Sequence, residues 1–356
     1  MKRILIINPF GIGDVIFTMS LVEALRSVYP KAVIGFLCNE RTAGLVRLNT
    51  SVNQTFVFNR DLFRRLWKKH PFLLLKKLKA LLRMVREYQF DAVFDLSLGR
   101  EYGFFCRWIG IKKRIGFNYK NRGVFLTDKI KIDGYSGRPV AETQLDLLEA
   151  AGIARSQARG LLPIKSSDLL KKEMSLFLKG KGLAEKDRLI ALAPGGGRSW
   201  GANAVFKQWD AEFFAEAVNK YIMNNPAKVM LLGDAQERSL LERTAALLKT
   251  SSVVIAGEEI EKVCALLERA ELLCCNDGGL LHLANALGVK TVSIFGPVDE
   301  KVYGPYGNDT LHAVVTEAVP CRPCYQQFHF PLCPHERRCL RNLPADKVVD
   351  AMKKIS

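Results

Sequence analysis

The chain has 356 residues, of which 48% are hydrophobic and 25% are charged. This length excludes a single ordinary core, and the composition is typical of a soluble globular protein, so two domains are predicted that need no disulfides. The formal net charge of +17 favours an acidic partner: nucleic acid, an anionic membrane surface or a phosphorylated substrate.

The first half of the chain opens as a βαβ unit. A buried parallel strand is predicted over Arg3–Asn8, followed by a loop that ends at Asp14, a helix over Val15–Val28 and a short strand over Ala32–Cys38. A further strand of the same kind is predicted over Phe90–Leu96. Such units favour a parallel sheet with helices on both faces.

No export or membrane-spanning segment is predicted. The apolar run Ile4–Ile7 ends at Asn8-Pro9 and is too short for a signal peptide, and no apolar stretch approaches the length of a membrane span. We therefore expect a cytoplasmic protein that could meet a membrane only by peripheral binding. Most of its nine cysteines are expected to be reduced.

A basic, leucine-rich segment follows over residues 60–87, and Pro71 divides it into two helical pieces. One interpretation is a solvated basic face over ordinary core leucines. The other is a pair of helices, from Arg60 to Arg86, that lie on an anionic membrane surface or on the phosphates of a lipid. Phe63, Trp67 and Phe72 stand among the basic residues, which favours the second interpretation.

The domain boundary is predicted after a helix over Ala141–Ala151, which Gly152 ends. The segment Ile153–Ser167 is rich in Gly, Pro, Ser and Arg and has little periodicity. We therefore expect a first domain over residues 1–165 and a second over 166–340. Residues 341–356 are expected to form a C-terminal helix that packs back on the first domain.

The second half repeats the alternation of strands and helices. Strands are predicted over Leu189–Ala193, Lys228–Leu232, Val253–Ala256, Leu272–Cys275 and Val289–Phe295, with helices over Phe213–Tyr221 and Leu281–Leu287. This pattern indicates a second doubly wound domain.

Four loops of small residues follow strands of the second domain. They are Pro194–Gly197, Gly233-Asp234, Asn276–Gly279 and Gly296-Pro297. Each glycine alone is explained by a tight turn. Together, at one sheet edge, the loops favour a nucleotide or diphosphate site, because glycines let backbone N–H groups approach phosphates.

The loop of the first domain, Gly11-Ile12-Gly13-Asp14, is different. It lacks the third glycine of a dinucleotide-binding fingerprint, which disfavours an NAD-type oxidoreductase. Asp14 stands where the helix is predicted to begin. The spacing alone favours an N-cap role for Asp14.

These motifs, in this order, resemble glycosyltransferase family 9, the heptosyltransferases of lipopolysaccharide core synthesis. The resemblance covers nearly the whole chain. It rests on Gly11-x-Gly13-Asp14, on Pro194-Gly195-Gly196-Gly197-x-Ser199-Trp200 with Lys207-Gln208-Trp209, on Leu232-Gly233-Asp234-x-x-Glu237, and on Asn276-Asp277-Gly278-Gly279 through His282 to Ala286, with Phe295-Gly296-Pro297.

The resemblance implies a GT-B fold, with two Rossmann-like domains facing across a cleft. It implies transfer of heptose from an ADP-activated donor to lipid A–Kdo, inverting the anomeric centre without an obligate metal or other cofactor. A monomer is expected. Asp14 would be the general base, Lys207 would contact the donor phosphates and Glu237 would hold the ribose or adenosine.

The remaining motif residues would line the substrates. Asp277, Gly279 and His282 would surround the donor sugar and diphosphate. The further positions are Gly11, Gly13, Gly195, Gly196, Gly197, Ser199 and Gly278. Gly278 departs from the family, in which many members have Thr, and this makes the identity of the sugar less certain than the fold.

Four cysteines gather near the end of the second domain: Cys321, Cys324, Cys333 and Cys339. The first pair has the spacing of a structural zinc site, whereas the rest of the spacing is irregular. Zinc and a disulfide are both kept as alternatives to free thiols.

Two other functions are kept beside heptosyl transfer. The same fold could transfer another sugar, a hexose or N-acetylhexosamine, from a different nucleotide. Alternatively, the chain could be a non-catalytic, nucleotide-dependent binding protein whose basic segment contacts RNA or DNA. The leucine-rich helices lack the aromatic platforms of nucleic-acid binders, so no nucleic acid partner is expected.

Overall fold

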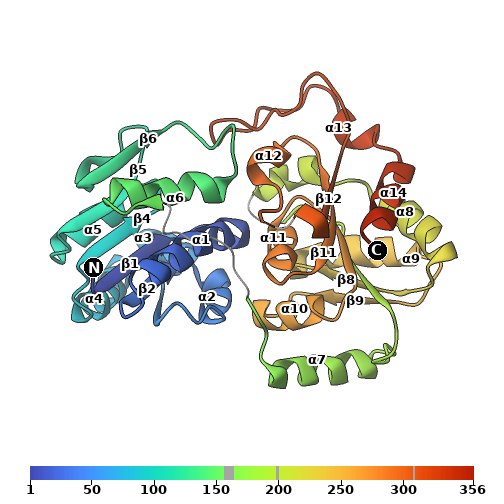
Figure 1. Cartoon of the computed structure of the whole chain (residues 1–356), viewed down its shortest axis with the longest axis horizontal. Coiled ribbons are helices and arrows are strands. Elements are labelled where there is room, and N and C mark those ends of the chain that lie inside the picture. The colour runs from blue at the N-terminus through green and yellow to red at the C-terminus, as the bar shows by residue number, and fades with distance from the viewer. Residues whose placement is uncertain (156–163, 198–199, 308) are drawn as a thin grey trace. The chain divides into compact units, whose positions relative to one another are not determined.

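The computed structural model describes residues 1–155, 164–197, 200–307 and 309–356. The chain divides into two compact units, Met1–Leu162 and Pro163–Ser356, close to the boundary expected after residue 165 (Figure 1). Each unit is built on a six-stranded sheet. Among the described helices, none is long and apolar enough to cross a membrane.

The first unit has the strand order β3-β2-β1-β4-β5-β6, all parallel, as in Rossmann domains. Its strands are β1 (Arg3–Asn8), β2 (Val33–Cys38), β3 (Gln54–Val57), β4 (Ala92–Asp95), β5 (Lys113–Tyr119) and β6 (Asp128–Ile132). Its helices are α1 (Ile12–Val28), α2 (Glu40–Arg47), α3 (Arg60–Lys69), α4 (Pro71–Glu87), α5 (Glu101–Trp108) and α6 (Val140–Ala150).

The second unit repeats this topology with the order β12-β11-β10-β7-β8-β9, again all parallel. Its strands are β7 (Leu189–Ala193), β8 (Lys228–Gly233), β9 (Ser252–Ala256), β10 (Leu272–Asn276), β11 (Lys290–Phe295) and β12 (His312–Thr316). Its helices are α7 (Asp168–Gly180), α8 (Ala211–Asn224), α9 (Arg238–Ala246), α10 (Ile260–Leu267), α11 (Gly279–Ala286), α12 (Glu300–Tyr303), α13 (Arg338–Arg341) and α14 (Ala345–Ile355).

The central strands form where the sequence has continuous apolar runs. β1, β7 and β10 are buried almost along their whole length, as expected for strands covered on both faces. The predicted pair of doubly wound domains is therefore confirmed. In each sheet the strand order reverses at one place, between β1 and β4 in the first unit and between β7 and β10 in the second. Ligands of such folds bind at these switch points.

The C-terminal helix α14 packs within the second unit. Val348, Val349, Met352 and Ile355 lie in the same buried cluster as Trp209 and residues of α8. On the polar side, Lys220 of α8 pairs with Asp346 at 2.8 Å. The apolar stripe of α14 is buried against α8, β11 and β12.

Candidate active site

Asn276 holds together the loops at the switch point of the second unit. It ends β10 and is 2% exposed. Its amide nitrogen donates to the carbonyl oxygens of Pro194 (2.7 Å) and Gly195 (3.3 Å), and its oxygen accepts the backbone N–H of Trp209 (3.0 Å). Asn276 therefore fixes the loop after β7 and the segment that follows Lys207, a role that sequence reasoning missed.

Lys207 and Asp277 form a buried ion pair beside these loops. The Lys207 ammonium lies 2.6 Å from the Asp277 carboxylate, and their side chains are 7% and 6% exposed. Removing two charges from water is costly, so such a pair is stable only with close geometry. The structure thus brings together two of the residues that the sequence assigns to the donor site.

Trp200 supports the same ammonium from a second side. The Lys207 Nζ lies 4.9 Å from the centroid of the Trp200 ring, within range of a cation–π interaction. The Trp200 ring is itself packed by Tyr325 and Phe330, each with its centroid 4.9 Å away. The long segment after β12 therefore helps to position Lys207.

This segment is attached to the loop after β11. Pro297 accepts the backbone N–H groups of Cys324 and Tyr325, both at 3.0 Å, and Arg322 donates to the carbonyl oxygen of Gly296. A Cβ at Gly296 would lie 2.9 Å from Leu340. The Gly296-Pro297 loop thus holds the segment from Arg322 to Tyr325 in place. Its predicted role among the phosphate-binding loops stays a prediction.

Glu237 joins the loops after β7 and β8. Its carboxylate accepts the backbone N–H groups of Gly197 (3.2 Å) and Asp234 (2.9 Å). A Cβ at Gly195 would lie 2.1 Å from a carboxylate oxygen, which explains the glycine there. Each carboxylate oxygen has further acceptor capacity, so these bonds are compatible with the nucleotide contact assigned to Glu237.

His282 lies on α11, the helix that begins after Asp277. It is 4% exposed, and burial lowers its pKa to about 4, with the Asp277 charge opposing and the Lys207 charge assisting that shift. The imidazole is therefore neutral near pH 7. The preceding Gly278 is the N-cap of α11, with an extended backbone at φ 176°, and Gly279 is the first helical residue.

The Asp14 loop of the first unit is arranged around the start of α1. Gly11 is the N-cap, and Asp14 is the third helical residue, whose carboxylate accepts the Gly11 N–H at 3.2 Å. The expected N-cap role of Asp14 is therefore wrong, because α1 begins earlier than predicted. Asn8 donates to the Asp14 carbonyl oxygen (3.1 Å) and to Thr18 (2.7 Å).

Asp95 is a second carboxylate at the switch point of the first unit, and sequence reasoning missed it. It ends β4 beside β1 and is 4% exposed. Its oxygen accepts the Ser97 N–H at 2.9 Å. Burial raises the pKa of Asp95 to about 6, and the hydrogen bonds from Ser97 offset only part of the effect. The signal that could have identified it is topological: β1 and β4 border the crevice.

Comparison with known proteins identifies the family. The family model described as glycosyltransferase family 9 (heptosyltransferase) matches residues 78–329. The chain belongs to this family. The resemblance inferred from the motifs is thereby confirmed, and this family 9 protein is a glycosyltransferase.

Its relatives are distant. A lipooligosaccharide heptosyltransferase 2 of Campylobacter jejuni is 28% identical over 174 residues, covering 48% of this chain and 52% of the relative. Lipopolysaccharide heptosyltransferase 2 of Salmonella typhimurium is 24% identical and covers 83% of both chains. The solved structure of E. coli ADP-heptose LPS heptosyltransferase II has a TM-score of 0.77 at 20% identity, covering 100% of this chain and 98% of that one. The fold is of GT-B type.

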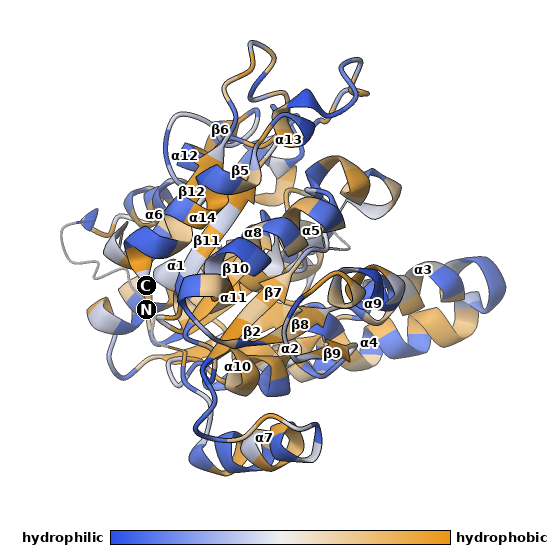
Figure 2. Cartoon of the chain, turned by 90° about the vertical axis from the view of Figure 1, so that its right-hand side faces the viewer, coloured by the Kyte–Doolittle hydropathy of each residue, from blue (hydrophilic) through white to orange (hydrophobic). Residues whose placement is uncertain are grey.

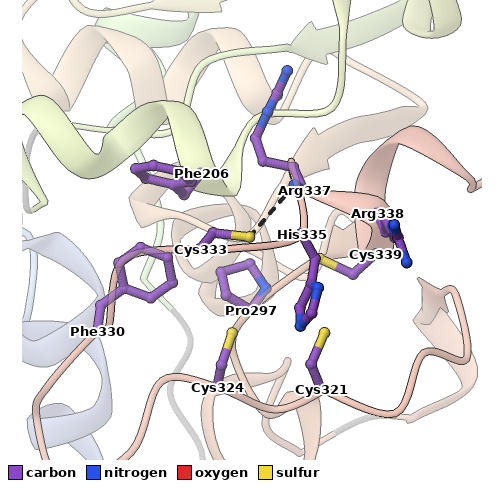
Figure 3. A pocket seen from close by; sticks show the side chains of 10 residues that line it. All are labelled: Phe206, Pro297, Cys321, Cys324, Phe330, Cys333, His335, Arg337, Arg338 and Cys339. Atoms are coloured by element: carbon purple, nitrogen blue, oxygen red, sulfur yellow. Dashed lines mark hydrogen bonds between the residues drawn. The ribbon is translucent and has the colours of Figure 1, made fainter.

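The four-cysteine segment of the family 9 protein lines a small pocket together with Phe206, Pro297 and His335 (Figure 3). Cys333 accepts the backbone N–H of Arg337 at 3.4 Å. All nine cysteines are free thiols. Across the described residues, no group of three or more His, Cys, Asp or Glu side chains is arranged to hold a metal ion, so the structure does not support the zinc alternative.

The predicted site residues fall into two groups, one in each unit. Ser199 lies outside the described residues. Gly13 is the second residue of α1, between the N-cap and Asp14. The structure therefore brings together Gly11, Gly13 and Asp14 in the first unit. Apart from Ser199, it brings the other predicted residues together around the β7–β10 switch point of the second unit.

Proposed function

We propose that this glycosyltransferase transfers a heptose from an ADP-activated donor to a lipopolysaccharide inner-core acceptor, lipid A–Kdo, with inversion. The observation that carries the proposal is the buried Lys207–Asp277 pair at the β7–β10 switch point, beside the glycine loops. The heptosyltransferase relatives support the sugar and the acceptor, and the ADP-heptose enzyme of E. coli supports the donor.

The second unit binds the donor in this proposal. Lys207 contacts the diphosphate and balances the charge that develops as it departs, and the N–H groups at the start of α11 add to that stabilisation. Glu237 holds the ribose or adenosine. Asp277, Gly279 and His282 surround the sugar and diphosphate, with His282 serving as a neutral hydrogen-bonding group.

The first unit provides the base. Asp14 takes the proton of the acceptor hydroxyl as that oxygen attacks the anomeric carbon. The start of α1 favours the ionised carboxylate and weakens it as a base, whereas exclusion of water by the bound substrates opposes this effect. Because Lys207 and backbone N–H groups meet the charge of the leaving diphosphate, the reaction proceeds without a metal. Transfer that persists in EDTA tests this point.

We place the enzyme in the cytoplasm as a monomer, bound peripherally to the inner face of the inner membrane through residues 60–86. A lipid-linked acceptor is presented at a membrane surface, and this segment is basic and amphipathic.

The donor is tested by thermal unfolding with a panel of nucleotide sugars, because a ligand that binds only the folded state raises its stability by mass action. ADP-heptose is expected to give the largest shift. If only UDP-sugars shift the transition, the heptosyl proposal fails. Transfer to a Kdo-containing acceptor, followed by the anomeric configuration of the product, then tests the reaction itself.

A second candidate, transfer of another sugar, is favoured by one observation. Gly278 stands beside the proposed sugar site without the hydroxyl that many relatives have there. Among the described residues, a Cβ at this position would meet the Asn276 carbonyl oxygen alone, at 3.9 Å. The site therefore has space where those relatives have a side chain. ADP-linked and UDP-linked hexoses in the same panel separate the two functions.

A further inference from the structure

The helices α3 and α4 meet at a corner that exposes large apolar side chains. We define the α3–α4 corner as residues Trp67–Leu75. Trp67 is 73% exposed, Phe72 87% and Leu75 58%. Exposure of this order on neighbouring aromatic and aliphatic side chains indicates a surface with a function, because scattered single residues are the rule elsewhere.

The exposed residues of the corner are distinct from the stripe that anchors α4 to its unit. Leu74 and Val85 are buried, and Val85 lies in the core cluster with Phe90 and Leu5. At 100° per residue, Phe72 shares a helix face with Lys76, Lys79 and Arg83, opposite that stripe. Packing against the core therefore accounts for the buried side chains of α4, but not for the exposed apolar side chains of the corner.

Positive charge surrounds the corner. Residues 62–86 contain no Asp or Glu. The exposed basic side chains here are Arg65, Lys68, Lys69, Lys76, Lys77, Lys79, Arg83 and Arg86. Within the described part of the chain, Arg83 of this set forms an ion pair with Glu87 at 3.3 Å. Figure 2 shows hydrophilic and hydrophobic residues side by side along both helices.

We infer that the α3–α4 corner inserts into the interface of an anionic lipid bilayer. Trp67, Phe72 and Leu75 enter the boundary between headgroups and acyl chains, while the neighbouring lysines extend their ammonium groups to the lipid phosphates. Nucleic acid would satisfy the charge but offers no apolar phase for Phe72 and Leu75. The inference gives the proposed peripheral membrane binding a specific surface, and it does not depend on the identity of the donor.

The test is co-sedimentation of the full chain with vesicles of phosphatidylcholine, with and without phosphatidylglycerol. The variant Trp67→Ser/Phe72→Ser is expected to weaken binding to anionic vesicles about tenfold or more, including at high salt. The matched control is Trp108→Ser, which removes an aromatic side chain that is 66% exposed on α5. It is expected to leave binding unchanged.

Charge is tested with a second set. Lys76→Gln/Lys77→Gln/Lys79→Gln is expected to abolish the preference for anionic vesicles, whereas Lys172→Gln/Lys353→Gln/Lys354→Gln makes the same change in net charge at exposed sites of the second unit and is expected to retain it. Intrinsic fluorescence of Trp67, obtained by difference from Trp67→Phe, should shift to the blue with anionic vesicles.

Two outcomes would overturn the inference: corner and control variants that bind vesicles equally, or binding of the parent chain to duplex RNA with none to anionic vesicles. Thermal shifts with nucleotide sugars are measured on every variant. Normal shifts with lost vesicle binding support the corner alone, and normal vesicle binding without any nucleotide response rejects the proposed function alone.

Discussion

Asp95 and Asp277 occupy equivalent places in the two units and differ in what faces them. Asp95 is the last residue of β4, which lies beside β1 at the switch point of the first sheet. Asp277 directly follows β10, which lies beside β7 at the switch point of the second. Asp277 has the Lys207 ammonium at 2.6 Å, whereas Asp95 accepts backbone N–H from Ser97. The same fold thus buries the Asp277 carboxylate beside a cation and the Asp95 carboxylate beside a backbone amide. Of these two sites, the one at Asp277 has a described cation, Lys207, that could meet an anionic ligand.

Breaking the ion pair gives the largest expected effect. Lys207→Met and Asp277→Asn each leave one buried charge without its partner, so each is expected to lower the free energy of unfolding by about 3 to 5 kcal/mol. The double variant should lose much less than the sum of the two. Urea unfolding of the two single variants and the double variant measures the interaction energy between Lys207 and Asp277. Additive losses would contradict an ion pair that stabilises the folded state.

Asp14→Asn tests whether the first unit contributes chemistry or only structure. The amide oxygen can still accept the Gly11 N–H, so stability and donor affinity should stay close to those of the parent. Transfer should fall about 10²- to 10⁴-fold because the base is lost. Single-turnover transfer and donor titration are the measurements.

Asp14→Ala is the control, since it also removes the capping acceptor and is expected to cost about 1 kcal/mol of stability. Donor binding lost together with transfer in Asp14→Asn would argue for a structural role of Asp14.

Asp95→Asn sharpens the comparison through pH. The pKa of Asp95 is raised from 3.8 to about 6 on folding. The buried charge therefore lowers the free energy of unfolding by its full amount above pH 6 and has no effect below pH 3.8, where the carboxyl is protonated in both states. Two pKa units correspond to about 3 kcal/mol, so Asn should stabilise the protein by up to that amount at pH 8 and hardly at pH 4.

Thermal or urea unfolding across this pH range measures the effect. Asp133→Asn, at an exposed position of the same unit, is the control and should show little pH-dependent gain. A gain in Asp95→Asn that does not vary with pH would reject burial of the charge as its cause.

Gly278→Thr gives the smallest expected effect on stability. The backbone there is extended and a Cβ has room, so the change should stay within a few tenths of a kcal/mol, as for Gly and Thr at an N-cap. Its readout is the ranking of donor sugars. Gly257→Thr is the contrast, because φ is +84° and a Cβ would lie 2.8 Å from Ala235. If Gly278→Thr leaves the order of preference among donor sugars unchanged, the assignment of Gly278 to the sugar site is rejected.

The strands and the fold class could be predicted because continuous apolar runs of a parallel sheet leave few alternatives. The start of α1 could not be predicted, because Gly11 caps the helix with its backbone alone. A glycine in the sequence does not by itself indicate an N-cap. Four strands were missed: β3, β5, β6 and β12. Each is only partly buried, so its apolar pattern is weaker than that of the central strands.

The arrangement of the site depends on contacts between loops far apart in sequence. Asn276 joins segments 67 and 82 residues away, and Asp95 is defined by its neighbour in the sheet rather than in the chain. Likewise, the apolar stripe of α14 indicates an amphipathic helix in the sequence, but it does not indicate which core the stripe completes.

The packing of α14 has a consequence for synthesis of the protein. Because Val348, Val349, Met352 and Ile355 complete the second core, and Tyr325 and Phe330 support Trp200, the second unit cannot close around Lys207 until α14 has been translated. The first unit is complete much earlier and can fold while the ribosome is still working. A chain released before α14 would carry a finished first unit and an unfinished second core.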